Sequence, residues 1–302
     1  MKTIRIGTRG SQLALYQAGL VEQHLKKTFP ETTVQIQVIK TEGDERLDVS
    51  LDTFEGKGVF TKTLEDALLA DKIDLAVHSV KDMAAELPKR LTLLAVLERE
   101  NPQDCLISLN NTQLMDLKPN ARIGTSSVRR KAQLKRLRPD IEIVDIRGNV
   151  DTRLKKMADG EYDGLIMAYA GIKRLNFHEQ VTQMLDTEFF IPPCGQGAVG
   201  LEGREGNMDL LKVCSSINHE ETEIRVDSER MFLYILEGGC QIPCGVLSEV
   251  NGNQFSIRAG IWAKDGSEEI LGSRTGNKTE ATELAKSLAE ELISKGAKRL
   301  MG

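Results

Sequence analysis

Two cysteines stand close together in the segment Glu237-Gly238-Gly239-Cys240-Gln241-Ile242-Pro243-Cys244-Gly245. A thiolate is a nucleophile, and the two glycines before Cys240 let the backbone take conformations that other residues avoid, so this turn can present its sulfur. Cys244 follows Pro243, and we expect it to be a small buried hydrophobe with a raised thiol pKa and low reactivity. A cysteine in a turn can equally be inert, so the segment alone allows either role.

Cations gather where helices are expected to begin. Thr8-Arg9-Gly10-Ser11 precedes one expected helix, and Thr125-Ser126-Ser127-Val128-Arg129-Arg130 precedes a second. Serine and threonine are ordinary N-caps, but the helix dipole disfavours cations in a first turn by a few tenths to about 1 kcal/mol each. Arg129 and Arg130 therefore indicate a bound anion, because arginine pairs well with carboxylates. The alternative is a solvated helix face.

Further arginines follow the next expected strands. Arg147 is followed by Arg153, and Lys173-Arg174 comes directly after Ala170-Gly171-Ile172. Between residues 121 and 156, eleven basic residues stand against four acidic ones, in a chain whose formal net charge is −5. Parallel strands bring such residues to one edge of a sheet, where α/β folds bind ligands. The sequence predicts a ligand with many carboxylates or phosphates.

Two other segments can take part in chemistry. His78-Ser79-Val80-Lys81-Asp82 follows an expected strand, and Asp82 can serve as a general acid or base or can stabilise a cation. Its structural alternative is an N-cap or a salt bridge. The polar segment 44–58 is expected to be a loop, either a plain surface connection or a lid that carries Lys57.

Strands that alternate with helices must position these residues. Hydrophobic periodicity predicts strands at 3–7, 33–39, 73–77 and 91–97 and helices at 11–27 and 59–70. The pattern then restarts: Arg5-Ile6-Gly7-Thr8 recurs as Arg122-Ile123-Gly124-Thr125, and residues 73–78 are echoed by residues 162–167. We interpret the repeat as two similar α/β lobes, each built on a parallel sheet that helices cover on both faces. A helix at 221–236, a strand at 254–262 and a helix at 280–295 predict a smaller α+β domain.

Composition excludes several classes of protein. The chain has 302 residues, a net charge of −5 and 4% aromatic residues, which argues against a general nucleic-acid binder. Met1–Ile6 runs straight into charge, and no apolar stretch approaches the ~20 residues that cross a bilayer. Five scattered cysteines and four histidines indicate reduced thiols and no metal site. We expect a cytoplasmic protein that binds neither nucleic acid nor membrane.

Taken together, these segments resemble the hydroxymethylbilane synthase (porphobilinogen deaminase) family over nearly the full length of the chain. Each segment is only moderately specific, but their joint order is highly specific. The segments that carry the resemblance are 6–15, 56–60, 78–82, 124–130, 147–154, 170–175, 195–198 and 236–243.

The resemblance implies an α/β fold of two periplasmic-binding-protein-like, doubly wound lobes and a small C-terminal α+β domain. The expected boundaries are 1–98 with a returning segment at 198–216, then 103–193, then 220–302. It also implies a monomeric transferase with a dipyrromethane cofactor joined by a thioether to Cys240. Such an enzyme condenses four units of its substrate porphobilinogen, releases ammonia at each step, and hydrolyses the product to the linear tetrapyrrole hydroxymethylbilane.

The resemblance further assigns roles to individual residues. The implied catalytic residues are Arg9, Lys81 and Asp82, of which Asp82 would bind pyrrole N–H groups and steady the cation formed when ammonia leaves. The implied cofactor-binding residues are Lys81, Asp82, Thr125, Ser126, Ser127, Arg129, Arg130, Arg147, Gly171 and Cys240. The implied substrate-binding residues are Arg9, Ser11, Lys57, Arg147, Arg153, Arg174 and Gln196. The chain departs from the family pattern at Cys194, Gly203 and Cys244.

The main alternative is a non-catalytic, two-lobed binding protein for an organic polyanion. Such a receptor would need neither Asp82 nor the Gly-Gly-Cys turn. A transcription regulator with a similar effector domain would need a helix-turn-helix, whereas the chain begins directly with the first expected strand.

Overall fold

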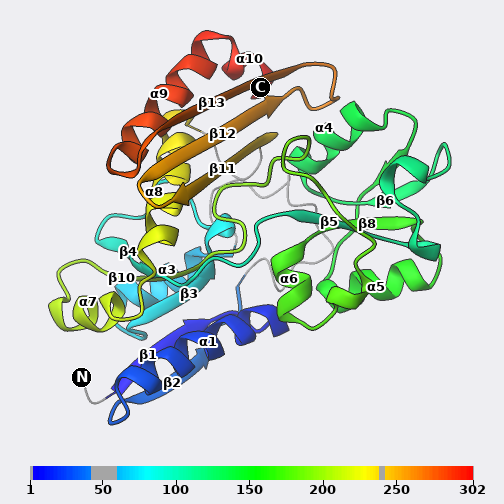
Figure 1. Cartoon of the computed structure of the whole chain (residues 1–302). Helices are drawn as coiled ribbons and strands as arrows, with labels where there is room; N and C mark the ends of the chain where they lie inside the picture. Colours follow the sequence, from blue (N-terminus) through cyan, green and yellow to red (C-terminus); the bar gives the residue numbers. More distant parts are fainter. Residues whose placement is uncertain (1–2, 42–59, 238–241, 302) are drawn as a thin grey trace. The chain divides into compact units, whose positions relative to one another are not determined.

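The computed structural model of the chain describes residues 3–41, 60–237 and 242–301 (Figure 1). Its contacts divide the chain into two compact units. Unit 1 comprises residues 1–100 and 197–226, and unit 2 comprises residues 101–196 and 227–302. Among the described residues, no helix is both long and apolar enough to pass through a membrane.

Unit 1 is built on a five-stranded sheet with the order β2-β1-β3-β10-β4. Its strands are β1 (Thr3–Thr8), β2 (Thr33–Val38), β3 (Leu75–Ser79), β4 (Leu91–Val96) and β10 (Val199–Arg204). β1 runs parallel to β2 and β3, whereas β10 is antiparallel to both β3 and β4. The expectation of a wholly parallel sheet was therefore wrong, because β10 joins the sheet from a distant part of the chain.

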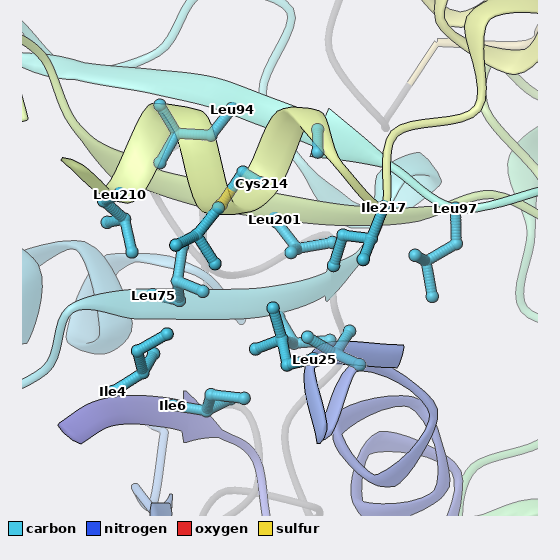
Figure 2. Packing of buried hydrophobic residues seen from close by; sticks show 14 of the residues in the cluster. Ile4, Ile6, Leu25, Leu75, Leu94, Leu97, Leu201, Leu210, Cys214 and Ile217 are labelled. Carbon is cyan, nitrogen blue, oxygen red and sulfur yellow. The ribbon is translucent and has the colours of Figure 1, made fainter. Parts of the chain in front are cut away.

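Helices cover both faces of this sheet. On one face, α1 (Gln12–Thr28) and α7 (Met208–Ser215) pack on the strands, and Figure 2 shows Leu25, Leu210 and Cys214 meeting the strand residues in one apolar cluster. On the other face, α3 (Lys62–Leu69) buries Leu64 and Leu68 against β3 and β4. The two-sided cover agrees with the α/β class expected from the periodicity.

Unit 2 contains a second five-stranded sheet with the order β7-β6-β8-β5-β9. Its strands are β5 (Asp104–Ser108), β6 (Arg122–Gly124), β7 (Glu142–Val144), β8 (Gly164–Ala168) and β9 (Gln183–Met184). Its helices are α4 (Val128–Leu137), α5 (Val150–Ala158) and α6 (Tyr169–Arg174). α4 packs on one face of the sheet, and α5 and α6 pack on the other.

The strand registers confirm the internal repeat. Ile6 lies opposite Ile36 and Leu75 in the first sheet, and Ile123 lies opposite Ile143 and Gly164 in the second. In each sheet the fourth strand is antiparallel: β10 in unit 1 and β5 in unit 2. The two lobes thus share one strand order, although different parts of the chain supply the fourth strand.

The C-terminal part of unit 2 is an antiparallel sheet with helices. Its strands are β11 (Cys244–Asn251), β12 (Gln254–Trp262) and β13 (Glu269–Asn277), and its helices are α8 (Glu220–Ile235, of which residues 220–226 belong to unit 1), α9 (Ala281–Ser294) and α10 (Ala297–Met301). Gly272 lets α9 lie close to β13, because a Cβ there would stand 2.8 Å from Leu288 Cδ1. The expected fold class, two α/β lobes and a small α+β part, is confirmed.

Short 3-10 helices complete the described elements. They are η2 (Val80–Asp82), η3 (Leu109–Asn111), η4 (Leu114–Asp116), η5 (His178–Gln180) and η6 (Lys278–Glu280).

Gly197, just before β10, allows a test of how closely the returning segment packs against the backbone of Glu100. Its φ is +90°, and a Cβ there would lie 2.2 Å from the carbonyl oxygen of Glu100. We expect Gly197→Ala to lower the free energy of unfolding by about 2–5 kcal/mol, because backbone cannot move aside cheaply. Gly206 is the matched control, since its φ is +78° and nothing lies within 4 Å of its added Cβ. Gly206→Ala should cost only about 1 kcal/mol; equal losses in urea unfolding would contradict the described contact.

Candidate active site

Unit 1 contains an open pocket at the carboxyl ends of β1 and β3. Its volume is about 390 Å³, including solvent space at the mouth, and Arg9, Ser11 and Asp82 all line it. The sequence had marked these three residues separately, and the strand order of the lobe brings them together. A cation, a hydroxyl and a carboxylate therefore share one small space.

The first strand-to-helix turn forms one wall of this pocket. Ser11 is the N-cap of α1, and its hydroxyl accepts a hydrogen bond from the backbone N–H of Ala14 at 3.3 Å. The guanidinium carbon of Arg9 lies 4.0 Å from the centre of the Phe60 ring, an arrangement in which the ring face attracts the cation. The positive end of α1 and the guanidinium make this wall suited to an anion.

The turn after β3 also lines the pocket, through Ser79 and Asp82. Asp82 ends the short helix η2, beside the partly exposed Lys81. Ser79, at the end of β3, accepts a hydrogen bond from Gln17 Nε2 of α1 at 2.8 Å. Sequence reasoning missed Gln17 and Phe60 as pocket residues. A buried glutamine on an otherwise apolar helix face was the available signal for Gln17.

In unit 2, two of the predicted site arginines surround a buried carboxylate. Arg129 donates to Asp104 Oδ2 at 2.7 Å, and Arg130 donates to Asp104 Oδ1 at 2.6 Å. Arg129 also donates to the carbonyl of Ile191 at 2.8 Å, and Arg130 donates to that of Ile166 at 2.9 Å. The sequence predicted that these arginines bind an external anion, but the carboxylate of Asp104 already pairs with both of them. Sequence reasoning missed Asp104. Their binding of the cofactor stays a prediction.

Asp104 stays negatively charged although it is buried. The residue is fully buried, and burial alone would raise the pKa of its carboxyl. The positive charges of Arg129 and Arg130, with hydrogen bonds from Arg130 and Gln196, outweigh that effect and lower the pKa to about 2. Asp104 is therefore ionised at neutral pH, and it neutralises one of the two guanidinium groups.

The hydroxyls at the start of α4 make local hydrogen bonds. Ser127 is the N-cap and accepts from the N–H of Arg130. Ser126 donates to the carbonyl of Ile146 at 2.8 Å and accepts from its N–H at 3.1 Å. Thr125 accepts from the N–H of Ser127 at 3.3 Å. These bonds hold the turn after β6 against the end of β7.

Arg147 and Arg153 add positive charge to this part of unit 2. Arg153 Nε donates to the carbonyl of Gly148 at 2.7 Å. Burial, together with the like charges of Arg130 and Arg147, lowers the pKa of Arg153 to about 10. Nη2 of Arg147 is buried and has no hydrogen-bond partner among the described residues. A ligand rich in carboxylates fits this group of arginines, because it would supply the missing acceptors and the missing negative charge.

The remaining predicted residues fall in different places. Gly171 and Arg174 are buried in α6. Gln196 is buried and donates to Asp104 Oδ1 at 3.0 Å and to the carbonyl of Pro102 at 2.6 Å. Lys57 and Cys240 lie outside the described residues. Within the described residues, no group of three His, Cys, Asp or Glu side chains could hold a metal ion.

The lobes and their arginine-rich turns define a class of two-lobed α/β proteins suited to an organic polyanion. Two family descriptions match the chain: "Porphobilinogen deaminase, dipyromethane cofactor binding domain" over residues 4–212, and "Porphobilinogen deaminase, C-terminal domain" over residues 223–294. The chain belongs to the porphobilinogen deaminase family. The predictions of an enzyme and of a dipyrromethane cofactor are confirmed, and the non-catalytic alternative is not supported.

Individual relatives agree over the whole length. The chain is 46% identical to the porphobilinogen deaminase of Syntrophomonas wolfei, with 100% of this chain and 98% of the relative covered. It is 44% identical to that of Geobacter sp. strain M21, with 100% and 94% covered. Among solved structures, the methionine binding protein MetQ aligns with 11% identity and a TM-score of 0.46, with 74% of this chain and 92% of that chain covered.

Replacing Asp104 tests the buried charge network. Asp104→Asn leaves the guanidinium groups of Arg129 and Arg130 buried without their counter-ion, and we expect a loss of about 3–5 kcal/mol in the free energy of unfolding. Asp145→Asn is the control, because the Asp145 side chain pairs with Lys131 but is 68% exposed. The control should lose far less stability in the same urea titration. Equal losses would mean that Asp104 is not the central counter-ion.

The same carboxylate predicts a pH dependence. Its folded-state pKa of about 2 lies below the ordinary value of 3.8, so its stabilising effect is complete above about pH 4 and is lost as the pH falls toward 2. Thermal unfolding at stepwise lower pH should show this loss in the wild type and a smaller one in Asp104→Asn.

Proposed function

We propose that the chain acts as a hydroxymethylbilane synthase whose second lobe holds the carboxylates of the cofactor and of the growing product. The observation that carries this proposal is the surplus of positive charge around Arg130, Arg147 and Arg153, including Nη2 of Arg147, for which the described part of the chain supplies no hydrogen-bond partner. Every pyrrole unit of this chemistry carries two carboxylates. Each addition therefore brings two negative charges that these arginines can bind.

Arg147 and Arg153 are the residues best placed to hold the cofactor. Both are partly buried, and neither guanidinium has an ion pair with a carboxylate among the described residues. Arg129 and Arg130 already share Asp104, so we assign them the further task of fixing the turn in which Thr125, Ser126 and Ser127 stand. When bound, the dipyrromethane would supply the free pyrrole carbon to which the first unit is joined, and each later unit would be joined to the pyrrole added before it.

The pocket of unit 1 is where we place the reacting end of porphobilinogen. Arg9 and Ser11, at the start of α1, would bind a substrate carboxylate. Asp82, which also lines the pocket, would accept a hydrogen bond from the pyrrole N–H. When the C–N bond of the aminomethyl group breaks and ammonia leaves, the substrate becomes cationic, and the Asp82 carboxylate stabilises that charge. Lys81, Arg174 and Gln196 are proposed to assist in binding.

Cys240 is our candidate for the thioether. Cys105, Cys194, Cys214 and Cys244 are all buried, and burial raises the thiol pKa of Cys105, Cys214 and Cys244 to about 12. Such thiols are almost entirely protonated at neutral pH and are poor nucleophiles. Cys244 is buried, as expected, and Cys240 is the remaining cysteine.

The first test of the function is the intact mass of the purified protein, read together with the Ehrlich colour reaction for pyrroles. The wild type and Cys244→Ser should carry the mass of a dipyrromethane, give the colour and convert porphobilinogen. Cys240→Ser should have the bare polypeptide mass, give no colour and be inactive. A bare wild-type mass without turnover would refute the proposed function, and an adduct that persists in Cys240→Ser would refute the attachment site.

Asp82 can be tested by a change that keeps its shape. Asp82→Asn removes the carboxylate charge that stabilises the developing cation, so kcat should fall by at least about 10²-fold with a smaller change in KM. Asp66→Asn is the control, since Asp66 is an exposed carboxylate of α3 outside the pocket. Steady-state kinetics on protein with equal pyrrole content checks both variants. Wild-type kcat in Asp82→Asn would remove Asp82 from the mechanism.

A cytoplasmic location, a monomeric state and the domain boundaries 1–98 with 198–216, 103–193 and 220–302 stay predictions. Light scattering of the purified protein would test the monomer.

A further inference from the structure

A buried pair of ionisable residues lies beside the pocket of unit 1. His78 Nε2 is 2.9 Å from Glu202 Oε2, and the two side chains are 3% and 0% exposed. His78 also lines the pocket, whereas Glu202 lies on β10. The two atoms are within hydrogen-bond distance, and the tautomer of the His78 ring decides which of them donates. This contact connects the pocket residue His78 to β10, the strand in the returning segment.

A second buried carboxyl lies near this pair. Glu65 of α3 is also buried, and burial, with the negative charge of Glu202 as a smaller cause, raises the pKa of its carboxyl. A buried carboxyl without a partner is unfavourable. The contact with His78 gives Glu202 such a partner.

The strand register explains how the two residues meet. His78 lies opposite Gly200, and Ala76 lies opposite Glu202, so His78 and Glu202 are diagonal neighbours on one face of the sheet. A Cβ at Gly200 would stand 3.1 Å from Val80 Cγ2. Glycine therefore lets η2, which carries Asp82, pack closely on β10. The N–H of Val80 also donates to the carbonyl of Ala198 at 3.1 Å.

The second lobe shows that the fold itself does not require this pair. Because Leu75 and Gly164 occupy the same register position, His78 corresponds to Met167 and Glu202 corresponds to Ile107. Met167 and Ile107 are buried in one apolar cluster. In the second lobe, hydrophobic side chains thus occupy the positions equivalent to His78 and Glu202. The same lobe has Gly171 at the position equivalent to Asp82.

We propose that His78 and Glu202 form a positioning pair for Asp82. The pair ties the end of β3 to β10, and so fixes the turn from which the Asp82 carboxylate faces the pocket. The inference rests on the proposed function, because it assigns Asp82 to the reaction. A misplacement of about 1 Å in a catalytic group can cost as much as 10²-fold in rate, so loosening this turn should lower kcat more than it raises KM.

Two substitutions of His78 separate positioning from other roles. His78→Ala removes the ring that contacts Glu202, and we expect kcat to fall about 10-fold or more with less than about a threefold change in KM. His78→Gln places an amide N–H near the former Nε2, and it should recover most of the lost kcat. Glu202→Gln keeps the shape of the pair without burying an unpaired charge. It is the second variant in case His78→Ala does not fold. Its kcat should fall several-fold.

The matched control lies at the other end of the same two strands. Asp74, just before β3, pairs with Arg5 at 2.8 Å and with Arg204 of β10 at 3.6 Å. Asp74→Asn should lower the melting temperature and leave kcat unchanged. The melting temperature, kcat, KM and Ehrlich colour are measured for every variant. Equal colour shows that a lower kcat does not come from lost cofactor.

Each result decides the proposal. Low kcat in His78→Ala with recovery in His78→Gln supports it. Equally low kcat in both variants would make His78 a proton-transfer group and overturn it. If kcat is unchanged in His78→Ala and Glu202→Gln and only the melting temperature falls, the pair contributes to stability alone, as the Asp74 ion pairs do, and the proposal is overturned. A wild-type protein without turnover would instead count against the proposed function.

Discussion

The charge buried at Asp104 organises the second lobe. A fully buried carboxylate is stable only with partners, and Asp104 has three: Arg129, Arg130 and Gln196. Arg129 and Gln133 both donate to the carbonyl of Ile191, so the network ties the start of β5 and the helix α4 to the segment before Gln196. Hydrogen bonds hold the turn that opens α4, and preorganised donors bind an anion without the cost of ordering them first.

One carboxylate does not balance the arginines around it. Arg130 and Arg147 both lower the pKa of Arg153, and Nη2 of Arg147 has no partner among the described residues. Such a cluster is unfavourable by itself and becomes favourable when a polyanion binds. In the first lobe, Glu202 and His78 instead contact each other. In the proposed function, the arginines of the second lobe serve binding, whereas the pair in the first lobe holds Asp82 in place.

Local patterns in the sequence predicted the elements better than their pairing. The repeat of Ile6 as Ile123 was visible because each stands in a short apolar strand, and the registers confirm it. The resemblance implied a returning segment at 198–216, which contains β10, but the antiparallel direction of β10 was not predicted, since strand direction depends on contacts more than a hundred residues away in sequence. Asp104 was missed for the same reason: nothing in its own segment distinguishes it, and its importance comes from arginines 25 and 26 residues later.

The repeat also shows how one strand order can serve two tasks. Asp82 and Gly171 occupy equivalent positions after β3 and β8, and so do His78 and Met167. In the proposed function, a carboxylate after β8 would oppose the binding of anions in the second lobe, so a residue without a side chain suits that place. A carboxylate after β3 would be useful because a cation would form there. The two lobes differ in the side chains that follow equivalent strands, and we propose that this difference, rather than the fold, divides the binding of carboxylates from the stabilisation of the cation.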